Sequence, residues 1–219
     1  SQNTAIGYES LLDNSTGDNN AALGYRSGTN ITTGANNTAL GSKALQTNTT
    51  ASNNTAVGYI ALGAVTTGAD NIGLGAFAGD AITTGASNVA IGSSSLTSCT
   101  TANDNVAVGT LALNTCITGA GNVAVGDSAL RHTTVSENTA IGKRAGTAVT
   151  TGHSNTLIGS LAGEAITSGD ENIMVGHNIE NNSAGADANI VIGNNIAGAG
   201  TNTVRIGTSA GTATLTIDG

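Results

Sequence analysis

The side chains that could bind a metal ion or move a proton are few and scattered along the chain. The three histidines, His132, His153 and His177, occupy different positions in a repeating unit, so no two are placed to share a metal ion. The carboxylates avoid the short apolar phrases described below, as a solvated surface requires. They include Asp13, Asp18, Asp70, Asp80, Asp104, Glu137, Glu164, Asp170 and Glu171. We therefore expect no catalytic residues, no metal site and no cofactor, and a protein that is not an enzyme.

Calcium and phosphate are alternatives that the spacing of residues argues against. The acidic segments 13–19 and 170–171 could attract Ca²⁺, but neither has the regularly spaced Gly-Asp nonapeptide of calcium-binding rolls. The Gly-x-x-Ala-Gly spacing does not make a phosphate loop, because no helix or lysine follows it.

The two cysteines have a spacing that could bring them together. Cys99 and Cys116 are 17 residues apart, and each follows a glycine of the repeat by seven residues. Stacked units would place them about 4.8 Å apart, inside the Cα–Cα range of a disulfide. The same position holds Ile31, Val65 and Ile82 in other units. Two buried thiols acting as small hydrophobic side chains are therefore the alternative to a disulfide between coils.

Threonine pairs raise the question of ice binding, because stacked threonines form ladders of hydroxyl groups. Ice-binding solenoids present Thr-x-Thr with both hydroxyls on one face, whereas neighbouring threonines in a strand point apart. A following glycine also favours a turn. We therefore expect these pairs to be structural. They are 32–33, 49–50, 66–67, 83–84, 100–101, 133–134 and 150–151.

All of these side chains are positioned by one five-residue phrase, Asn-x-Ala-(Ile/Val/Leu)-Gly, which recurs from residues 3–7 to residues 189–193. Its glycines are 17 residues apart, with one spacing of 16 between Gly126 and Gly142. A short and strict period indicates one supersecondary unit stacked on itself. The stacked asparagines should form a ladder whose amides satisfy buried backbone groups. They are Asn3, Asn20, Asn37, Asn54, Asn71, Asn88, Asn105, Asn122, Asn138, Asn155, Asn172 and Asn189.

Each phrase has the length and composition of a short strand, and turns with a second short strand should complete each unit. The sequence therefore predicts an all-β fold, a parallel β-solenoid (β-roll) of about twelve 17-residue coils. Because both faces of the phrase are apolar, one should line the lumen and the other should need a cover. A partner chain is the simplest cover, so we expect a homotrimer, intertwined or side by side.

The regularity of the repeat divides the chain. Residues 1–193 should form the solenoid, and residues 194–219 an irregular terminal coil or a junction to a following segment. The missing residue between Leu130 and Asn138 should fall in a turn. Because the chain begins inside a repeat, we expect it to be a fragment or a processed product, with any targeting signal outside it.

The composition excludes several classes of partner. The net charge is −8 with only six basic residues, which argues against nucleic acid. No apolar run approaches the ~20 residues that span a bilayer, so we expect no membrane insertion. The chain has no tryptophan and one phenylalanine, so the core must be built of aliphatic side chains.

The phrases Asn-Thr-Ala-Ile-Gly, Asn-Thr-Ala-Val-Gly and Asn-Val-Ala-Ile-Gly, with Ala or Ser three residues on, resemble the head repeats of trimeric autotransporter adhesins. They resemble still more the repeat arrays of phage tail-fibre proteins, and residues 202–214 are similar to a segment that precedes a self-cleaving chaperone domain there. The resemblance implies a left-handed parallel β-roll, three chains side by side and an extracellular location on a virion or cell. Adhesin heads repeat about every 14 residues, so the 17-residue period should enlarge the Thr-Thr-Gly turn.

We therefore expect a structural and adhesive fibre segment, a rigid multivalent rod that attaches to a host or surface through a cell-surface glycan or protein receptor. The tyrosines Tyr8, Tyr25 and Tyr59 each follow a phrase glycine and could form an exposed strip for glycans, or be incidental. A self-assembling extracellular filament is the main alternative, and an ice-binding solenoid is the other.

Overall fold

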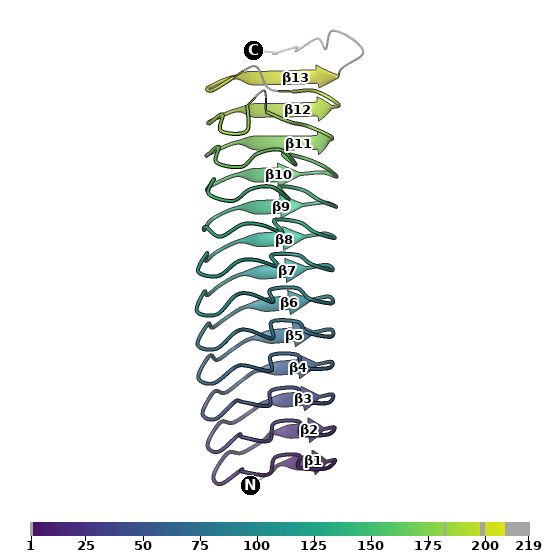
Figure 1. The fold of residues 1–219 in the computed structure, drawn as a ribbon, viewed down its shortest axis with the longest axis vertical. Coiled ribbons are helices and arrows are strands. Elements are labelled where there is room, and N and C mark those ends of the chain that lie inside the picture. Colours follow the sequence, from purple (N-terminus) through teal and green to yellow (C-terminus); the bar gives the residue numbers. More distant parts are fainter. Residues whose placement is uncertain (1, 182, 198–199, 209–219) are drawn as a thin grey trace, which may run out of the picture.

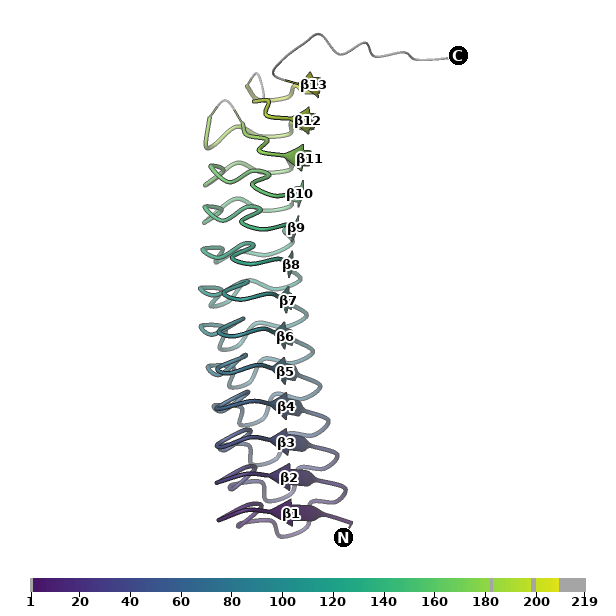
Figure 2. The same ribbon diagram turned by 90° about the vertical axis from the view of Figure 1, so that its right-hand side faces the viewer.

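The chain forms a rod of stacked coils with one strand in each coil (Figure 1). The computed structural model describes residues 2–181, 183–197 and 200–208. Within them, thirteen strands form one parallel sheet in sequence order, and Figure 2 shows them as a single column. The strands are β1 (Thr4–Ile6), β2 (Ala21–Leu23), β3 (Thr38–Leu40), β4 (Thr55–Val57), β5 (Ile72–Leu74), β6 (Val89–Ile91), β7 (Val106–Val108), β8 (Val123–Val125), β9 (Thr139–Ile141), β10 (Thr156–Ile158), β11 (Ile173–His177), β12 (Ile190–Asn194) and β13 (Val204–Thr208). The predicted all-β parallel solenoid of about twelve turns is confirmed.

The strands pair in the register that the repeat predicts, with equivalent phrase residues side by side. Ala39 pairs with Ala56, for example. The missing residue does not disturb this register, since β8 and β9 pair normally across a spacing of 16. Thr133 is buried at the position that aliphatic residues fill in other coils, and Thr134 donates a hydrogen bond to the Thr150 carbonyl at 3.0 Å. The shortening therefore falls on the exposed second threonine of the turn.

The second strand expected in each coil is absent from the described residues, which corrects that prediction. The cause lies in the backbone after the phrase glycine. In the third coil, Lys43 and Leu45 have φ of 61° and 48°, and Asn53, just before the next phrase, has φ of 62°. Left-handed residues at alternate positions cannot continue an extended strand. Single inter-coil hydrogen bonds hold this wall instead, such as Leu45 N–H to the Ala61 carbonyl at 3.1 Å.

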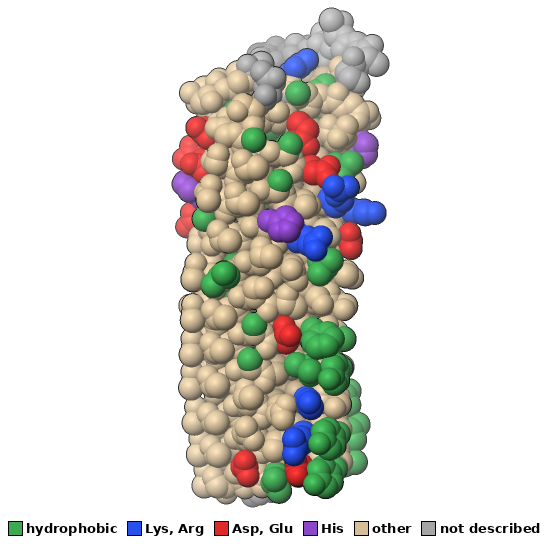
Figure 3. Space-filling model, viewed as in Figure 1, with side chains coloured by type: hydrophobic (Ala, Val, Ile, Leu, Met, Phe, Trp, Pro, Cys, Tyr) green, Lys and Arg blue, Asp and Glu red, His purple; other side chains and the backbone are tan. Residues whose placement is uncertain are grey.

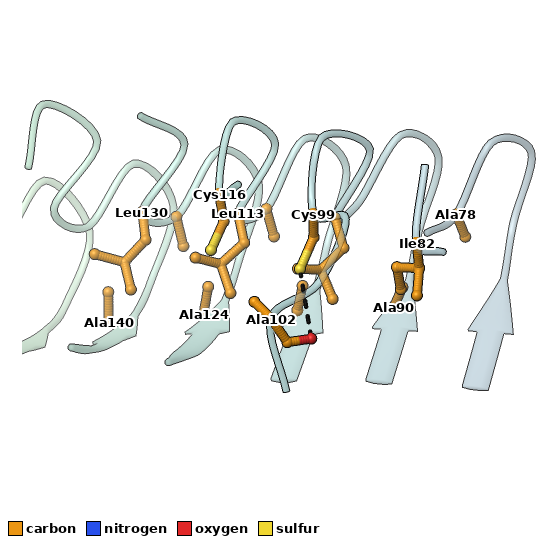
Figure 4. Packing of buried hydrophobic residues seen from close by; sticks show 14 of the residues in the cluster. Ala78, Ile82, Ala90, Cys99, Ala102, Leu113, Cys116, Ala124, Leu130 and Ala140 are labelled. Carbon is orange, nitrogen blue, oxygen red and sulfur yellow. Dashed lines mark hydrogen bonds between the residues drawn. The ribbon is translucent and has the colours of Figure 1, made fainter. Parts of the chain in front are cut away.

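The core is a narrow column of small and aliphatic side chains inside the coils (Figure 4). The second residue of each strand from β2 to β12 is buried inside the coil, as are Ala90, Ala107 and Ala124, and the leucines of the facing wall pack against them. Where the middle residue is Leu157, the neighbouring leucine positions hold Gly146 and Gly163. A Cβ at either glycine would come within 2.7 Å of a Leu157 methyl group. A large side chain at one wall is thus matched by glycine at the other, as close packing requires.

The sheet extends past residue 193, where the solenoid was expected to end. That position lies inside β12, and β13 adds one more strand in register, with Ile192 paired to Ile206. This last coil is shorter, and Thr203 rather than Asn202 follows Asn189 in the asparagine column, 14 residues on. Residues 209–219, the end of the expected irregular terminal coil or junction, lie outside the described residues.

Candidate functional site

The phrase asparagines lie in one buried column along the rod. Each side-chain oxygen accepts the backbone N–H of the next asparagine, as in Asn105 N–H to Asn88 Oδ1 at 3.1 Å. From Asn3 to Asn172, each side-chain amide also donates to a carbonyl of the turn before the next phrase, as in Asn88 Nδ2 to the Ala102 carbonyl at 2.9 Å. Every phrase asparagine from Asn20 to Asn189 is buried. The column therefore satisfies backbone groups that the lumen would leave unpaired, and its polar atoms are used up in doing so.

The threonine pairs divide their two side chains between the wall and the solvent. In five of the seven pairs, the first threonine donates to a backbone carbonyl of the next coil, as from Thr66 Oγ1 to the Thr83 carbonyl at 3.1 Å. In the shortened coil, Thr133 is buried and Thr134 makes this bond instead. The second threonine, such as Thr67, is exposed. Because the two hydroxyls of a pair point into different surroundings, the pairs do not form the flat double row that an ice-binding face would need.

Cys99 and Cys116 lie on adjacent coils, as their spacing predicts, and both are buried free thiols (Figure 4). Cys116 Sγ donates to the Gly119 carbonyl at 3.1 Å. The hydrogen bond between the two thiols and their burial raise the pKa of Cys99, which disfavours the reactive thiolate. A disulfide between the coils stays a prediction, and mass spectrometry with and without reductant tests it.

The titratable side chains do not assemble into a reaction centre. Among the described residues, no group of three or more His, Cys, Asp or Glu side chains could hold a metal ion. His153 Nε2 lies 3.4 Å from an Asp170 carboxylate oxygen on the surface, whereas His132 and His177 are exposed elsewhere. The acidic segments 13–19 and 170–171 lie on different coils far apart along the rod.

The outer face of the sheet is an apolar stripe that runs the full length of the rod. We call it the sheet face and define it by the first and third residues of β1–β10 and their equivalents in β11–β13. Exposed side chains on it include Ile6 (59%), Leu23 (45%) and Ile141 (41%). The third residues are all aliphatic: Ile6, Leu23, Leu40, Val57, Leu74, Ile91, Val108, Val125, Ile141, Ile158, Val175, Ile192 and Ile206. The alanine side of the phrase faces the lumen, and the larger aliphatic side faces outward.

The sheet face is hollowed where its side chains are smallest. A shallow apolar depression of about 240 Å³ lies over β1–β3, around Ala21 between Thr4 and Thr38, with Leu23 and Leu40 beside it. A flat stripe with a hollow can accept an aliphatic side chain of another molecule.

A second surface, which we call the aromatic edge, comprises Tyr8, Tyr25, Tyr59 and Phe77. All four are exposed and follow a phrase glycine by one or two residues. Tyr8 and Tyr25 stack, with ring centroids 5.6 Å apart, and Tyr59 meets Phe77 edge-on at 5.3 Å. Sequence reasoning found the tyrosines but missed Phe77, which is two residues past its glycine. Its place one coil and one residue after Tyr59 was the signal that could have found it.

Charged side chains accompany the first two tyrosines. Arg26 Nε lies 2.5 Å from a Glu9 carboxylate oxygen, and the guanidinium lies over the Tyr25 ring at 5.4 Å from its centroid. The hydrogen bond from Arg26 lowers the pKa of the Glu9 carboxyl. Because this ion pair is exposed, it contributes little to stability, and it leaves the edge with both donors and acceptors.

No protein-family model, curated protein or solved structure matches the chain. A search of the described residues found no helix with the length and hydrophobicity needed to cross a membrane. The sheet face and the aromatic edge both leave large apolar side chains exposed.

Proposed function

We propose that this chain is a rod segment of a homotrimeric extracellular fibre that attaches to a host or surface, as in phage tail fibres and trimeric adhesins. The observation that carries the proposal is the row of aliphatic third residues, which runs without a break along the sheet face from Ile6 to Ile206. Thirteen strands at the ~4.8 Å strand spacing, each about 10 Å long, present a stripe of roughly 600 Å². Monomeric proteins rarely expose larger apolar patches, and patches of this size mark interaction sites.

A second copy of the chain is a suitable cover for this stripe. Two such faces would bury about 1,200 Å² in total, which reaches the range of specific protein–protein interfaces. The partner must match the spacing of thirteen successive strands along the sheet face, and an identical chain has that spacing. Three chains with their stripes turned to a common axis would bury all three, and the adhesin and tail-fibre resemblance favours this arrangement over a pair.

The proposed role is mechanical and multivalent. A stack whose coils are joined by backbone hydrogen bonds, asparagine amides and a continuous core is stiff, and each of its surfaces is repeated on every chain. Weak contacts made by several identical faces add up through effective concentration. A cell-surface glycan or protein is the receptor class that suits such a rod, and the extracellular location belongs to the same proposal.

Light scattering in solution tests the assembly. The chain has a mass of 21.1 kDa, so a trimer should give about 63 kDa, the threefold multiple that closed cyclic symmetry requires. A value of 21.1 kDa at micromolar concentration would remove the proposal.

Two alternatives make different predictions for the same sample. A self-assembling filament should appear in electron micrographs as long fibres, whereas a fibre segment should give discrete rods about 60 Å long. Ice binding gains one observation, since Thr4, Thr38, Thr55, Thr139 and Thr156 point outward on the sheet face. β5–β8 interrupt this row with Ile72, Val89, Val106 and Val123. Thermal hysteresis in the purified protein would support ice binding, and its absence would remove it.

A further inference from the structure

The aromatic edge gathers every aromatic side chain of the chain in one place. The sequence has three tyrosines, one phenylalanine and no tryptophan, and all four rings lie where β1, β2, β4 and β5 end. Figure 3 shows hydrophobic side chains along this lower right edge. The narrow lumen explains why no ring is inside. It does not explain why the rings share one edge and five successive coils.

The rings form two pairs with a gap between them. Tyr8–Tyr25 and Tyr59–Phe77 are each within the 4.5–7 Å range of aromatic contacts. In the coil between the pairs, the equivalent position holds Ser42. Tyr25 and Tyr59 occupy the same position two coils apart, which corresponds to about 9.6 Å along the rod. A ring centred over Ser42 would lie about 4.8 Å from each, at stacking distance from both.

The polar groups around the gap define what kind of ring it suits. Ser42, at the equivalent position of the middle coil, carries a hydroxyl. Lys43, the next residue, makes no ion pair among the described residues, whereas Arg26 is already paired with Glu9. A tyrosine on the coil before and the coil after, a serine between them and the ammonium of the next residue match a sugar ring. Its C–H face can stack on a tyrosine, its hydroxyls can hydrogen-bond, and its carboxylate can meet the lysine.

We propose that the gap over Ser42, between Tyr25 and Tyr59, binds one acidic sugar residue of a cell-surface glycan. This inference rests on the proposed function, because it names the receptor class of the fibre. A homotrimer would carry three such sites, so that weak binding at each is raised by avidity. The net charge of −8 disfavours single-stranded nucleic acid, which also stacks on aromatic rings but needs a basic groove. Because the chain as a whole is negative, only the ammonium of Lys43 would attract the carboxylate of an acidic sugar.

Titration calorimetry with galacturonic acid oligomers, against neutral galactose oligomers, tests the site on the purified chain. The wild type should bind the acidic oligomer more tightly. Tyr59→Ala should weaken binding by roughly tenfold, the equivalent of one lost stacking contact. Lys43→Ala should abolish the preference for the acidic oligomer. His177→Ala, which changes an exposed residue at the same position of a distant coil, should bind as the wild type does.

Ser42→Tyr is the decisive variant, because it fills the gap with a ring instead of removing one. Tyrosine occupies the same position in neighbouring coils, so the variant should fold, continue the stack and lose binding. Binding retained by Ser42→Tyr, equal binding of both oligomers, or no binding by the wild type would each overturn the inference. Molar mass measured on the same samples separates the two proposals. A trimer that does not bind the oligomers would contradict only the proposed glycan site. A monomer would contradict the proposed homotrimeric fibre.

Discussion

At the scale of single residues, the asparagine column explains why one residue type recurs at every coil. The position needs an acceptor for a backbone N–H and a donor for a turn carbonyl at the same time. Asn88 does both, accepting from Asn105 and donating to Ala102. Aspartate has no donor when ionised, and serine is too short to reach both partners. The amide side chain is the smallest that satisfies both groups.

Asn88→Ala should therefore destabilise the protein by about 3 kcal/mol, because it leaves a buried N–H and a buried carbonyl without partners. Urea unfolding followed by circular dichroism measures the loss. Thr84→Ala, in the same coil, is the matched control, since Thr84 is exposed and its change should stay within about 0.5 kcal/mol. Equal effects of the two substitutions would contradict a structural role for the column.

A partly buried carboxylate gives the chain a pH-dependent weak point. Burial raises the pKa of Asp80 from its usual 3.8, and its Oδ1 atom has no hydrogen-bond partner. A carboxyl group with a higher pKa in the folded state than in the unfolded state binds its proton more tightly when the protein is folded. The free energy of unfolding therefore falls as the pH rises and this group ionises.

Asp80→Asn should thus raise stability near neutral pH by about 1 kcal/mol, the order of cost of an unsatisfied buried polar group. The gain should vanish at about pH 3, where the wild-type carboxyl is protonated in both states. Thermal melts of both proteins at the two pH values measure the difference. A gain that persists at acidic pH would point to a cause other than the charge.

At the scale of elements, each coil is one short strand closed by turns, and the glycine that ends the strand is needed for two reasons. Gly92 has φ of 122°, and a Cβ there would lie 2.6 Å from the carbonyl carbon of Gly109 in the next coil. The same contact recurs up the stack, with Gly109 against Gly126. Glycine therefore permits both the positive φ that turns the chain and the close contact between the backbones of neighbouring coils.

A pair of glycine substitutions separates these two reasons. Gly121 has φ of 67° but nothing within 4 Å of an added Cβ, so Gly121→Ala should cost only about 1–2 kcal/mol of backbone strain. Gly92→Ala adds a clash with backbone that cannot move aside, and should cost at least about 3 kcal/mol. Denaturant midpoints of the two variants give the comparison. Similar losses of stability in the two variants would mean that backbone strain alone, without the clash between coils, explains the need for glycine.

At the scale of the whole molecule, coils contact only their neighbours, so the length of the rod and the extent of its sheet face grow together. The apolar stripe is therefore a property of the stack and of no single coil. A charge placed on the stripe should disturb association with another copy while leaving the coil itself intact, because the side chain already points outward.

Val108→Lys, in the middle strand of the sheet face, should shift the molar mass from the trimer toward 21.1 kDa with an unchanged far-ultraviolet spectrum. Burying an unpaired ammonium in an apolar interface costs far more than exposing it in a monomer. Thr84→Lys places the same charge on an exposed turn and should leave the mass unchanged. A trimer that survives Val108→Lys would locate the interface elsewhere on the rod.

Much of the architecture follows from the sequence because a strict period leaves few structures available. The recurring asparagine and glycine predicted where the strands lie, and β1–β12 all fall within or immediately beside a phrase. The expected second strand failed for a local reason. Lys43 and Leu45 are ordinary residues with no preference for positive φ, yet the fold holds both left-handed, and only the closed shape of the coil requires it.

The sequence by itself determined that the units stack, because a strict period places each phrase residue beside the equivalent residue of the next unit. Only the tertiary structure decided which side of the phrase faces inward. In β2–β9 the inward residue beside the facing wall is alanine or glycine, and the larger side chains of the phrase are left outside. Every aromatic ring likewise lies at the surface, where register alone set the distance between Tyr25 and Tyr59.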